Sequence, residues 1–393
     1  MQLILFDDHS WANLLPLTFT RPAADLRVGI LTIAEKWEKH LETSPSYLTQ
    51  KQLSGKFGLT TADDNLLIKG SLLPNNELKA AIKALQEGDS LKKGDTLLAV
   101  RTRASDLEAF DPSVWIGEAS EYPGEISLID FPWNIFSLNG QEIEADMELL
   151  TKGRESEKLS DTVRITAPEN VFVEPGFKGE HFTLNAASGP IYLGPDSEIM
   201  EGSVIRGPFA LCEESTVKMA AKIYGPTTIG PNSKVGGEVN NCVIHSNSNK
   251  GHDGFLGNSV LGEWCNVGAD TNNSNLKNNY AELKVWNYPK ERFIKTGLQF
   301  CGLIMGDHSK CGINTMFNTG TVVGVSANIF GSGFPRNFIP SFSWGGASGM
   351  STYKMDKVLE TASLVMERRA QKLTEEDLAI LQWVFDYSGK YRK

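Results

Sequence analysis

The sequence has no excess of basic residues. It contains 38 Lys and Arg against 48 Asp and Glu, which gives a formal net charge of −10 at pH 7. Nucleic acids and anionic membrane surfaces bind proteins through basic faces. The acidic balance therefore argues against both as the main partner, although a few local Lys or Arg residues still allow a small anionic ligand to bind.

Long apolar runs are also missing. No run approaches the ~20 residues that a membrane-spanning helix needs. The segment MQLILFDDHSWANLL lacks a basic region and carries acids where a signal peptide would be apolar. We therefore expect a cytoplasmic protein.

Cysteine is scarce and lacks metal-binding spacing. The residues are Cys212, Cys242, Cys265, Cys301 and Cys311. None forms a CxxC pair, and an odd number fits no closed disulfide set. We expect buried, reduced thiols.

What the sequence does have is a beat of large aliphatic residues at every sixth position. The first run is Leu193, Ile199, Ile205, Leu211, Val217, Ile223, Ile229 and Val235. The beat returns at Phe255, Leu261 and Val267, and again at Met305, Cys311, Phe317, Val323 and Ile329. Most residues four positions after each of these are small, such as Ser197, Ser215 and Ser233.

This period predicts a parallel β-helix. A step of six residues rotates by about 600° around an α-helix and would scatter the aliphatic residues over its surface. Three hexapeptides instead form one triangular coil, with the aliphatic side chains inside and successive coils stacked at ~4.8 Å. By resemblance to other hexapeptide proteins, we expect the left-handed form and a homotrimer with active sites between neighbouring prisms.

The beat is interrupted at two places. The spacing from Val235 to Val243 is eight, which predicts two extra residues at a corner. A longer break separates Asn273 from Met305 and carries Lys284, Trp286 and Tyr288. Because basic and aromatic residues gather in this loop, we favour a site-forming role over a solvated excursion.

The beat also divides the chain. Residues 1–155 lack it, and their short apolar segments LILF, LLIKG and TLLAVRT alternate with helical stretches such as NELKAAIKALQE. This pattern predicts an α/β domain with a parallel sheet. Residues 156–345 are expected to form the β-helix. Residues 346–393 have helical spacing, with Thr374 as an N-cap and Asp377 at the capping-box position. We expect this tail to pack on the prism, with a lid role as the alternative.

One histidine lies in a stretch suited to chemistry. In NSNKGHDGFLGNSVLGEWCNVGADT, His252 stands between Gly251 and Gly254, which allow close approach of the backbone to a ligand. Acyl transfer to an amine needs a base that takes the amine proton. A neutral imidazole suits that task and contributes ~10²–10⁴ in rate. Taken alone, such a histidine is more often a surface or core residue.

The segments KGHDGFLGN and NVGADTNNSN closely resemble the acetyltransferase half of the bacterial bifunctional N-acetylglucosamine-1-phosphate uridyltransferase/glucosamine-1-phosphate acetyltransferase family. That family has a pattern like A-G-H-x-x-Y-L-G-D, then N-I-G-A-G-T-x-x-x-N-Y, in a left-handed β-helix. The resemblance implies that His252 is the base, that acetyl-CoA is the donor, and that an amino sugar or its 1-phosphate is the acceptor.

The same resemblance points to further site residues. Asn266, Asn275, Phe255 and Lys250 become candidate substrate contacts. Backbone N–H donors for the acetyl carbonyl are expected near Ala269 or Gly306, and Lys284 is a candidate contact for coenzyme A. Two tyrosines of the family pattern are replaced, by Phe255 and Leu276, so their hydroxyls are not available to a sugar phosphate.

The opening segment LLPLTFTRPAADLRVG resembles the start of sugar-phosphate nucleotidyltransferases. Those enzymes cradle a triphosphate in a Gly-rich turn, but here Asp8, His9 and Trp11 stand in place of the glycines. Farther on, Ser71 replaces an Asp that holds magnesium in that family. Candidate phosphate contacts are Arg21 and Arg27. Candidate Mg²⁺ ligands are Asp7 and Asp8.

These observations favour an enzyme of nucleotide-sugar and cell-envelope biosynthesis. We expect an acetyl-CoA-dependent N-acetyltransferase, paired with a divergent sugar-1-phosphate nucleotidyltransferase, acting on small sugar phosphates and nucleotides. Two alternatives stay open. The N-terminal domain could be inactive and regulatory, or the whole chain could be a non-catalytic scaffold.

Overall fold

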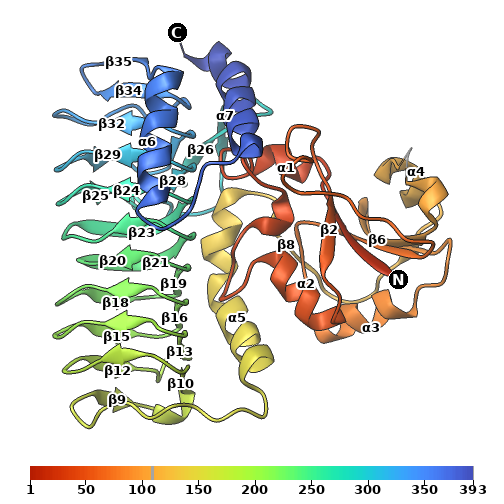
Figure 1. Cartoon of the computed structure of the whole chain (residues 1–393), viewed down its shortest axis with the longest axis horizontal. Helices are drawn as coiled ribbons and strands as arrows, with labels where there is room; N and C mark the ends of the chain where they lie inside the picture. The colour runs from red at the N-terminus through yellow and green to blue at the C-terminus, as the bar shows by residue number, and fades with distance from the viewer. Residues whose placement is uncertain (108–109, 393) are drawn as a thin grey trace. The chain divides into compact units, whose positions relative to one another are not determined.

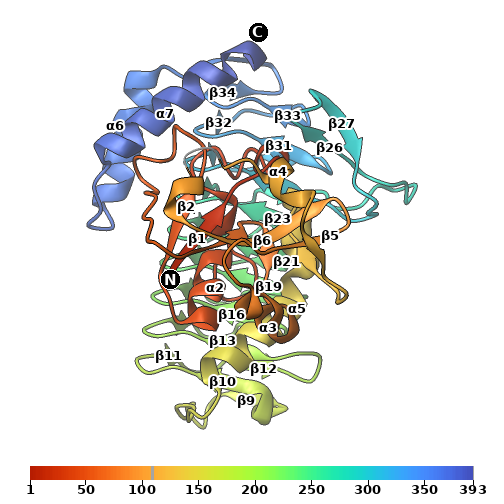
Figure 2. The same ribbon diagram turned by 90° about the vertical axis from the view of Figure 1, so that its right-hand side faces the viewer.

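The computed structural model describes residues 1–107 and 110–392 and forms two compact units (Figures 1 and 2). The first unit comprises Met1–Leu14, Thr20–Leu26 and Leu31–Phe131. The second comprises Leu15–Phe19, Arg27–Ile30 and the chain from Pro132 onward.

The first unit is an α/β domain, as expected, but its sheet is mixed rather than parallel. The strand order is β2-β1-β3-β6-β5-β7. Strand β1 pairs in parallel with β2 and β3, whereas β6 pairs antiparallel with β3 and β5. Only Gly94 and Asp95 separate β5 from β6, and so short a connection forces a hairpin. The elements of this unit are β1 (Gln2–Phe6), α1 (Ser10–Asn13), η1 (Ala23–Asp25), α2 (Ile33–Leu41), β2 (Pro45–Leu48), β3 (Asn65–Lys69), β4 (Leu72–Leu73), α3 (Asn76–Ala84), β5 (Ser90–Lys93), β6 (Thr96–Thr102), η2 (Ala104–Asp106), α4 (Pro112–Ile116), β7 (Ser120–Glu121) and β8 (Ser127–Leu128).

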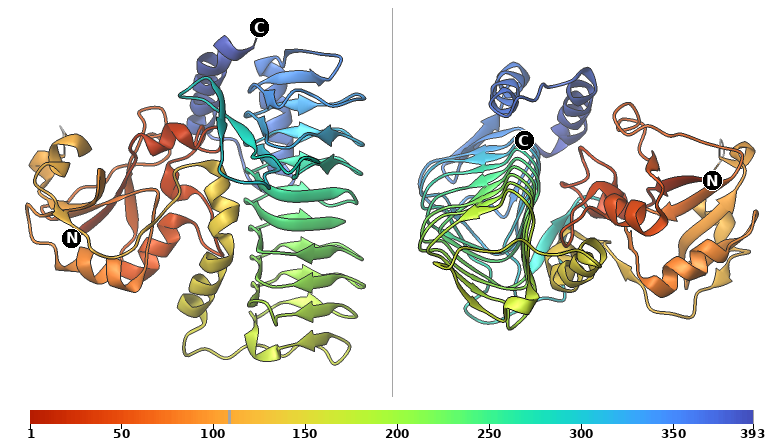
Figure 3. Two further views of the ribbon diagram at one scale, coloured as in Figure 1. Left: turned by 180° about the vertical axis from the view of Figure 1, so that it is seen from behind. Right: turned by 60° about the horizontal axis from the view of Figure 1, so that its bottom comes forward.

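The second unit contains the predicted parallel β-helix. Its coils stack in parallel register and enclose a common interior (Figure 3). Three walls, A, B and C, surround that interior. Strands β21 (Glu238–Ile244) and β23 (Phe255–Leu261) each begin in wall C and continue around a corner into wall A.

The strands of wall A are β10 (Val171–Val173), β13 (Ile191–Leu193), β16 (Phe209–Leu211), β19 (Thr227–Ile229), β28 (Leu303–Met305), β31 (Thr321–Val323) and β33 (Phe338–Ile339). Those of wall B are β11 (Lys178–Gly179), β14 (Glu198–Ile199), β17 (Thr216–Val217), β20 (Lys234–Val235), β22 (Asn249–Lys250), β24 (Asn266–Val267), β29 (Lys310–Cys311), β32 (Asn328–Ile329) and β34 (Ser343–Gly346), which turns back into β35 (Gly349–Thr352). Those of wall C are β9 (Arg164–Thr166), β12 (Thr183–Asn185), β15 (Val204–Arg206), β18 (Lys222–Tyr224), β21 (Glu238–Ile244), β23 (Phe255–Leu261), β25 (Asn272–Asn273) and β30 (Met316–Phe317), and the turn η3 (Pro168–Asn170) precedes β10.

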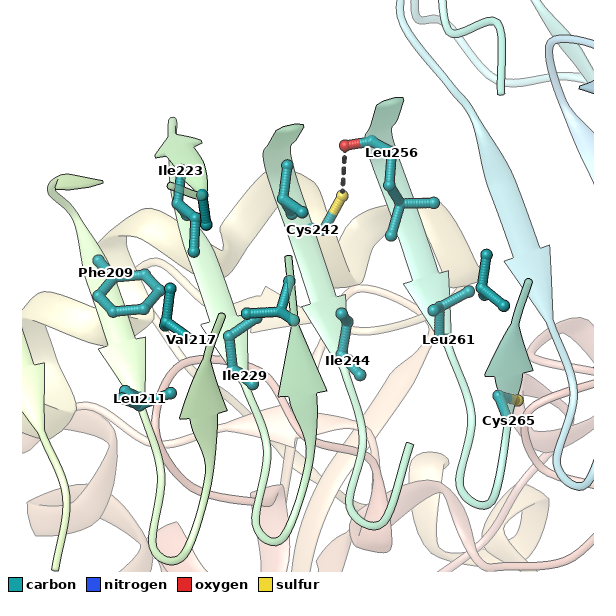
Figure 4. Packing of buried hydrophobic residues seen from close by; sticks show 14 of the residues in the cluster. Phe209, Leu211, Val217, Ile223, Ile229, Cys242, Ile244, Leu256, Leu261 and Cys265 are labelled. Carbon is teal, nitrogen blue, oxygen red and sulfur yellow. Dashed lines mark hydrogen bonds between the residues drawn. The ribbon is translucent and has the colours of Figure 1, made fainter. Parts of the chain in front are cut away.

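The aliphatic beat fills the interior of the prism. All eight residues of the first run, from Leu193 to Val235, are at most 1% exposed. Figure 4 shows part of this column, with the Cys242 thiol donating to the Leu256 carbonyl over 3.5 Å. Because all five cysteines are buried and free, the expectation of reduced structural thiols is confirmed. Burial raises the pKa of Cys242 to about 12, which keeps this thiol protonated.

The small residues of the beat link successive coils through their hydroxyls. Ser233 Oγ donates to the His245 carbonyl over 2.9 Å and accepts the Ser248 N–H over 3.0 Å. The same double contact is made by Ser215, Ser248 and Ser309. A small side chain at this position therefore does more than avoid crowding, because its hydroxyl satisfies buried backbone groups on the next coil.

One coil is shorter than its neighbours, not longer as the spacing suggested. Val217 pairs with Val235, eighteen positions on, whereas Val235 pairs with Lys250, only fifteen positions on. This coil needs fewer residues because β21 continues directly from wall C into wall A, with no separate turn at that corner. The prediction of two extra residues was wrong. Phe255 likewise does not take the inward position that the six-residue spacing predicts. Leu256, which pairs with Val239, takes that position instead.

Helix α5 (Pro132–Thr151) packs along wall A and holds the segment Arg27–Ile30. The Gly29 N–H donates to Asn139 Oδ1 over 2.8 Å, and Thr228 Oγ1 donates to the Gly29 carbonyl over 2.9 Å. Gly29 has φ +79°, and an added Cβ would lie 2.5 Å from Asp146 Oδ2. Only glycine fits this position.

The insertion packs against wall A and against the tail through aromatic rings. The insertion forms the hairpin β26 (Lys284–Asn287) and β27 (Arg292–Lys295). Trp286 stacks on Phe338 with centroids 4.2 Å apart, and Tyr288 meets Tyr391 edge-on at 5.5 Å. These aromatic residues, which we expected in a site, serve packing here. Helices α6 (Met355–Glu367) and α7 (Glu375–Ser388) precede η4 (Gly389–Tyr391), and the capping box of Thr374 and Asp377 is confirmed.

Within residues 1–107 and 110–392, we find no helix with the length and apolar character required to cross a membrane.

The serine contacts give a test of the coil architecture. Replacing Ser233 by Ala leaves the His245 carbonyl and the Ser248 N–H buried without this partner. We expect the free energy of unfolding to fall by ~1–3 kcal/mol in urea titrations followed by circular dichroism. The exposed Ser188 provides the control, and Ser188→Ala should change stability by less than ~0.5 kcal/mol. Equal effects of the two substitutions on the free energy of unfolding would contradict a stabilising role for the Ser233 hydroxyl.

Candidate functional site

A cavity of about 840 Å³ opens between wall B and helix α6. Its floor is formed by outward-facing residues of successive wall B coils, and its other side by one face of α6. The lining residues are Lys218, Lys234, Asn247, Asn249, Gly251, His252, Trp264, Cys265, Asn266, Val267, Gly268, Ala269, Lys310, Ile313, Thr361, Val365, Arg368 and Arg369. The volume lies within the ~300–1,000 Å³ typical of small-molecule sites.

His252 lies at the corner between β22 and β23 and has an exposed side chain on the cavity. The turn around it depends on Gly254, which has φ +110°. A Cβ at that position would lie 2.2 Å from the Thr271 carbonyl of the next coil. The close stacking of the two coils therefore fixes where the histidine backbone runs.

The cavity concentrates positive charge on an acidic protein. It is lined by Lys218, Lys234, Lys310, Arg368 and Arg369, and by no Asp or Glu. Among the described residues, none of these five cations takes part in an ion pair. Burial lowers the pKa of Lys310, and burial together with Arg368 lowers that of Arg369.

Polar groups of the cavity also remain available. The side chain of Asn247 is 8% exposed, and its Oδ1 has no hydrogen-bond partner within the described chain. Trp264 stacks on His308 with an interplanar angle of 13°, which makes a flat wall. Arg369 donates to the Asn232 carbonyl and, over 3.1 Å, to Asn249 Oδ1, so the end of α6 is tied to the prism.

The structure brings only some of the predicted site residues together. Asn266 and Ala269 line the cavity with His252. Phe255 and Asn275 lie together on wall C, where both side chains cover Gly257. Asn275 Nδ2 donates to Asn258 Oδ1 over 2.8 Å.

Three other predicted contacts lie apart from the cavity. Lys250 is 1% exposed and lies inside the prism. Gly306 is buried in the wall, where its N–H donates to the Val323 carbonyl over 2.8 Å. Lys284 is exposed on hairpin β26–β27, opposite Lys295. Their roles as ligand contacts stay predictions.

The five cations were missed from the sequence, although the beat contains the signal for some of them. Lys234 and Lys310 stand directly before an inward residue of wall B, and Lys218 stands directly after one. Neighbours of an inward strand residue face outward. The arginines carry no such signal, because their position depends on how α6 returns along the prism.

In the first unit, a cluster of polar side chains surrounds Asp8, in the segment that corresponds to the Gly-rich turn of sugar-phosphate nucleotidyltransferases. Asp8 Oδ2 accepts from the ammonium of Lys69, which is 1% exposed, and Asp8 Oδ1 accepts Ser10 Oγ over 2.6 Å. Burial alone would raise the pKa of Asp8, but Lys69 and Ser10 outweigh it and lower the pKa. Asp130 lies near Lys69 and Asp8, and burial raises the pKa of the Asp130 carboxyl group. Lys69 and Asp130 were not singled out from the sequence.

Asp7 is held differently. Its Oδ1 accepts the Ala23 N–H over 2.9 Å, and its Oδ2 accepts Thr49 Oγ1 over 2.5 Å. Burial raises the pKa of Asp7 to about 7 against these hydrogen bonds. Among the residues that the structure describes, no group of three or more His, Cys, Asp or Glu side chains gathers as a metal-ligand set.

The two candidate phosphate contacts are both buried. Arg21 is 5% exposed and pairs with Asp25 over 3.2 Å. Arg27 is 6% exposed, donates to the Ile30 carbonyl and belongs to the second unit. Neither guanidinium is free at a surface, and their phosphate role stays a prediction.

The chain is similar to known proteins over parts of its length. Residues 3–155 match the family model described as sugar nucleotidyl transferase. The chain is 26% identical over 272 residues to a bifunctional sugar-1-phosphate nucleotidylyltransferase/acetyltransferase of Sulfurisphaera tokodaii, covering 67% of this chain and 60% of that protein. It is 32% identical over 118 residues to the bifunctional protein GlmU of Methanocaldococcus jannaschii, covering 30% of this chain and 26% of that protein.

Among solved structures, the polySia specific acetyltransferase NeuO matches 54% of this chain and 99% of its own, at 14% identity and a TM-score of 0.30, which is too low to support an inference. The chain spans less than two thirds of the length of the two relatives above. The first of those relatives is a transferase by name. The chain is therefore similar to sugar nucleotidyl transferases over residues 3–155 and to these two bifunctional proteins over the segments that they match.

Proposed function

We propose that the second unit transfers the acetyl group of acetyl-CoA to the amine of an amino sugar or its 1-phosphate, with His252 as general base. One observation carries this proposal. An exposed imidazole opens into a cavity of about 840 Å³ lined by five cations and no carboxylate. Coenzyme A is a polyanion, and Lys and Arg side chains bind phosphates by charge-assisted hydrogen bonds.

The chemical step assigns one task to His252. The acceptor nitrogen attacks the thioester carbonyl, and a C–N bond forms as the C–S bond breaks. The imidazole takes the proton that the nitrogen loses and returns it to the leaving thiolate, so charge balances.

Ala269 is the better of the two expected oxyanion donors. The Gly306 N–H already donates to the Val323 carbonyl over 2.8 Å. On either side of Ala269, the Gly268 and Asp270 N–H groups bond to neighbouring carbonyls. The Ala269 N–H itself has no hydrogen-bond partner within the described part of the chain, and Ala269 lines the cavity. A fixed N–H of this kind stabilises developing oxygen charge.

Asn266 is the proposed acceptor contact inside the cavity, and Phe255 with Asn275 offers a second surface on the adjoining wall C. A homotrimer, with a second prism closing the site, is part of the proposal on the resemblance alone. Cytoplasmic nucleotide-sugar synthesis is proposed as the setting on the same ground.

The second candidate function is sugar-1-phosphate nucleotidyl transfer by the first unit. The match of residues 3–155 to the sugar nucleotidyl transferase model favours it. The residues present do not fit a preformed Mg²⁺ site. The Lys69 ammonium already binds the Asp8 carboxylate, and burial raises the pKa of Asp7 to about 7, which disfavours the charged form that binds a cation. We therefore derive no step through a metal. Pyrophosphate release with UTP, dTTP, ATP or GTP tests this function, and no turnover with any of them would contradict it.

The role of His252 has a direct test. The substitution His252→Ala should lower kcat for acetyl transfer to glucosamine 1-phosphate by ~10²–10⁴, because the general base is lost. Thiol release from acetyl-CoA provides the assay. His181→Ala, at an exposed corner of the same β-helix, is the matched control and should leave kcat unchanged. A loss smaller than tenfold for His252→Ala would remove this residue from the mechanism.

The cations of the cavity should set the affinity for coenzyme A. Lys234→Ala and Arg368→Ala each remove a charged donor, worth ~1.5–3 kcal/mol, so the Kd measured by calorimetry should rise by about tenfold or more. Lys222→Ala removes a lysine that pairs with Glu238 on wall C and should have no effect. Unchanged affinity in both cavity variants would place coenzyme A elsewhere.

Asp7 predicts a pH dependence of stability. Its pKa is raised by burial to about 7 in the folded chain, above ~3.9 in the unfolded chain. The folded state therefore binds the proton more tightly, and this stabilisation is lost as the pH rises through about 7. Relative to wild type, Asp7→Asn should gain stability between pH 4 and 7 by up to ~1.4 kcal/mol per pH unit.

Urea titrations at several pH values measure this difference, and the exposed Asp63→Asn controls for the loss of one charge. A constant difference between wild type and Asp7→Asn across that range contradicts the assignment.

A further inference from the structure

A lysine occupies a place inside the prism that neighbouring coils give to valine. Lys250 pairs with Val235 on one side, and the register of Asn249 with Asn266 sets it beside Val267 on the other. Its side chain is 1% exposed. An aliphatic or Met side chain would fill this place without the cost of removing an ammonium group from water.

The ammonium group makes one specific contact. Lys250 Nζ donates to the carbonyl oxygen of His252 over 2.5 Å. No carboxylate forms an ion pair with Lys250 within the described chain. The charge is therefore held in the prism by a carbonyl dipole of the same turn that carries the candidate base.

The turn around His252 needs this support. It lies between Gly251 and Gly254, two residues with little intrinsic backbone restriction. The carbonyls of Lys250, Asp253 and Gly254 accept backbone N–H groups of Gly236, Asp270 and Glu238. The His252 carbonyl instead receives the Lys250 amine, so a side chain supplies a link that the backbone ladder supplies elsewhere.

We propose that Lys250 is a positioning residue for acetyl transfer: its buried amine holds the carbonyl of His252 and so fixes the turn that presents the imidazole to the cavity. The inference rests on the proposed role of His252 as base. This role differs from the direct substrate contact expected from the sequence, because the Lys250 side chain is buried inside the prism.

Titration of the amine adds a pH dependence. The groups that face Lys250 are the carboxylates of Asp253 and Asp270 and the thiols of Cys242 and Cys311. Burial lowers the pKa of Lys250 to about 8, although Asp253 and the other groups oppose this shift. As the pH rises through about 8, the charged donor is lost and its hydrogen bond to the His252 carbonyl weakens.

The substitution Lys250→Met separates positioning from packing. Met fills a similar volume without the buried charge, so the midpoint of thermal unfolding at pH 7 should be unchanged or higher. Acetyl transfer should nevertheless fall in kcat by about tenfold or more, with KM for acetyl-CoA changed less than twofold. A residue that only packs would move stability and activity in the same direction. Val235→Met, at the paired inward position one coil away, is the matched control and should keep kcat.

Hydrogen exchange tests the contact without any assay of activity. The amides of Gly251–Gly254 should exchange about tenfold faster in Lys250→Met than in wild type at pH 7, and Val235→Met should not change them. In wild type alone, protection of this turn should fall between pH 7 and 9.5 after correction for the intrinsic exchange rate.

The outcomes separate the two proposals. Faster exchange with lower kcat supports the inference. Unchanged exchange in both experiments overturns it, and so does faster exchange with normal kcat. If wild type transfers no acetyl group, the proposed function fails and the catalytic role of Lys250 fails with it, while exchange still decides whether the amine holds the turn. If Lys250→Met does not fold, the wild-type pH series decides alone.

Discussion

The stacking of β-helix coils is the constraint on which the rest of the second unit depends. Inward aliphatic side chains fill the prism, and inward serines bind the carbonyl and N–H groups of the next coil. A coil held on both sides cannot shift without leaving buried polar groups unpaired. The corners are therefore rigid, and the corner that carries His252 is fixed against Thr271 through Gly254. A reactive side chain gains its position from this packing rather than from a dense network of its own.

Local charge, not net charge, determines what the cavity can bind. The chain is acidic overall, yet the lysines of wall B and the two arginines that directly follow α6 face one cavity without a carboxylate among them. Positive groups inside a concave surface strengthen each other's field at a bound anion. The tail helix belongs to this arrangement, because Arg369 anchors it to Asn232 and Asn249 beside the cavity. The first unit shows the opposite case, in which Lys69 already neutralises Asp8 and leaves less demand for an added cation.

Much of the fold could be predicted because a period of six has one structural meaning. Each residue of the first run points inward, and the capping box at Thr374 and Asp377 is present. The predictions are wrong where the six-residue spacing no longer matches the pairing register of the strands. Val243 was counted as inward, but Ile244 takes that place, since β21 crosses a corner without a turn. Lys250 and Phe255 were assigned from a motif, and a motif does not state which side of a strand faces the interior. The mixed sheet was missed because a hairpin turn at Gly94 was overlooked.

The site was predictable at its centre and not at its edges. His252, Asn266 and Ala269 are close in sequence to one corner, so spacing along the coils brings them together. Arg368 and Arg369 directly follow helix α6, far along the chain from this corner, and no local pattern encodes the path by which that helix returns along the prism. The most direct test of the whole account is a crystal structure of the protein with coenzyme A and glucosamine 1-phosphate. We predict that the coenzyme A sulfur lies within hydrogen-bonding reach of the His252 imidazole and that its phosphates lie on the cavity cations. Coenzyme A bound away from wall B, with His252 facing only solvent, would contradict it.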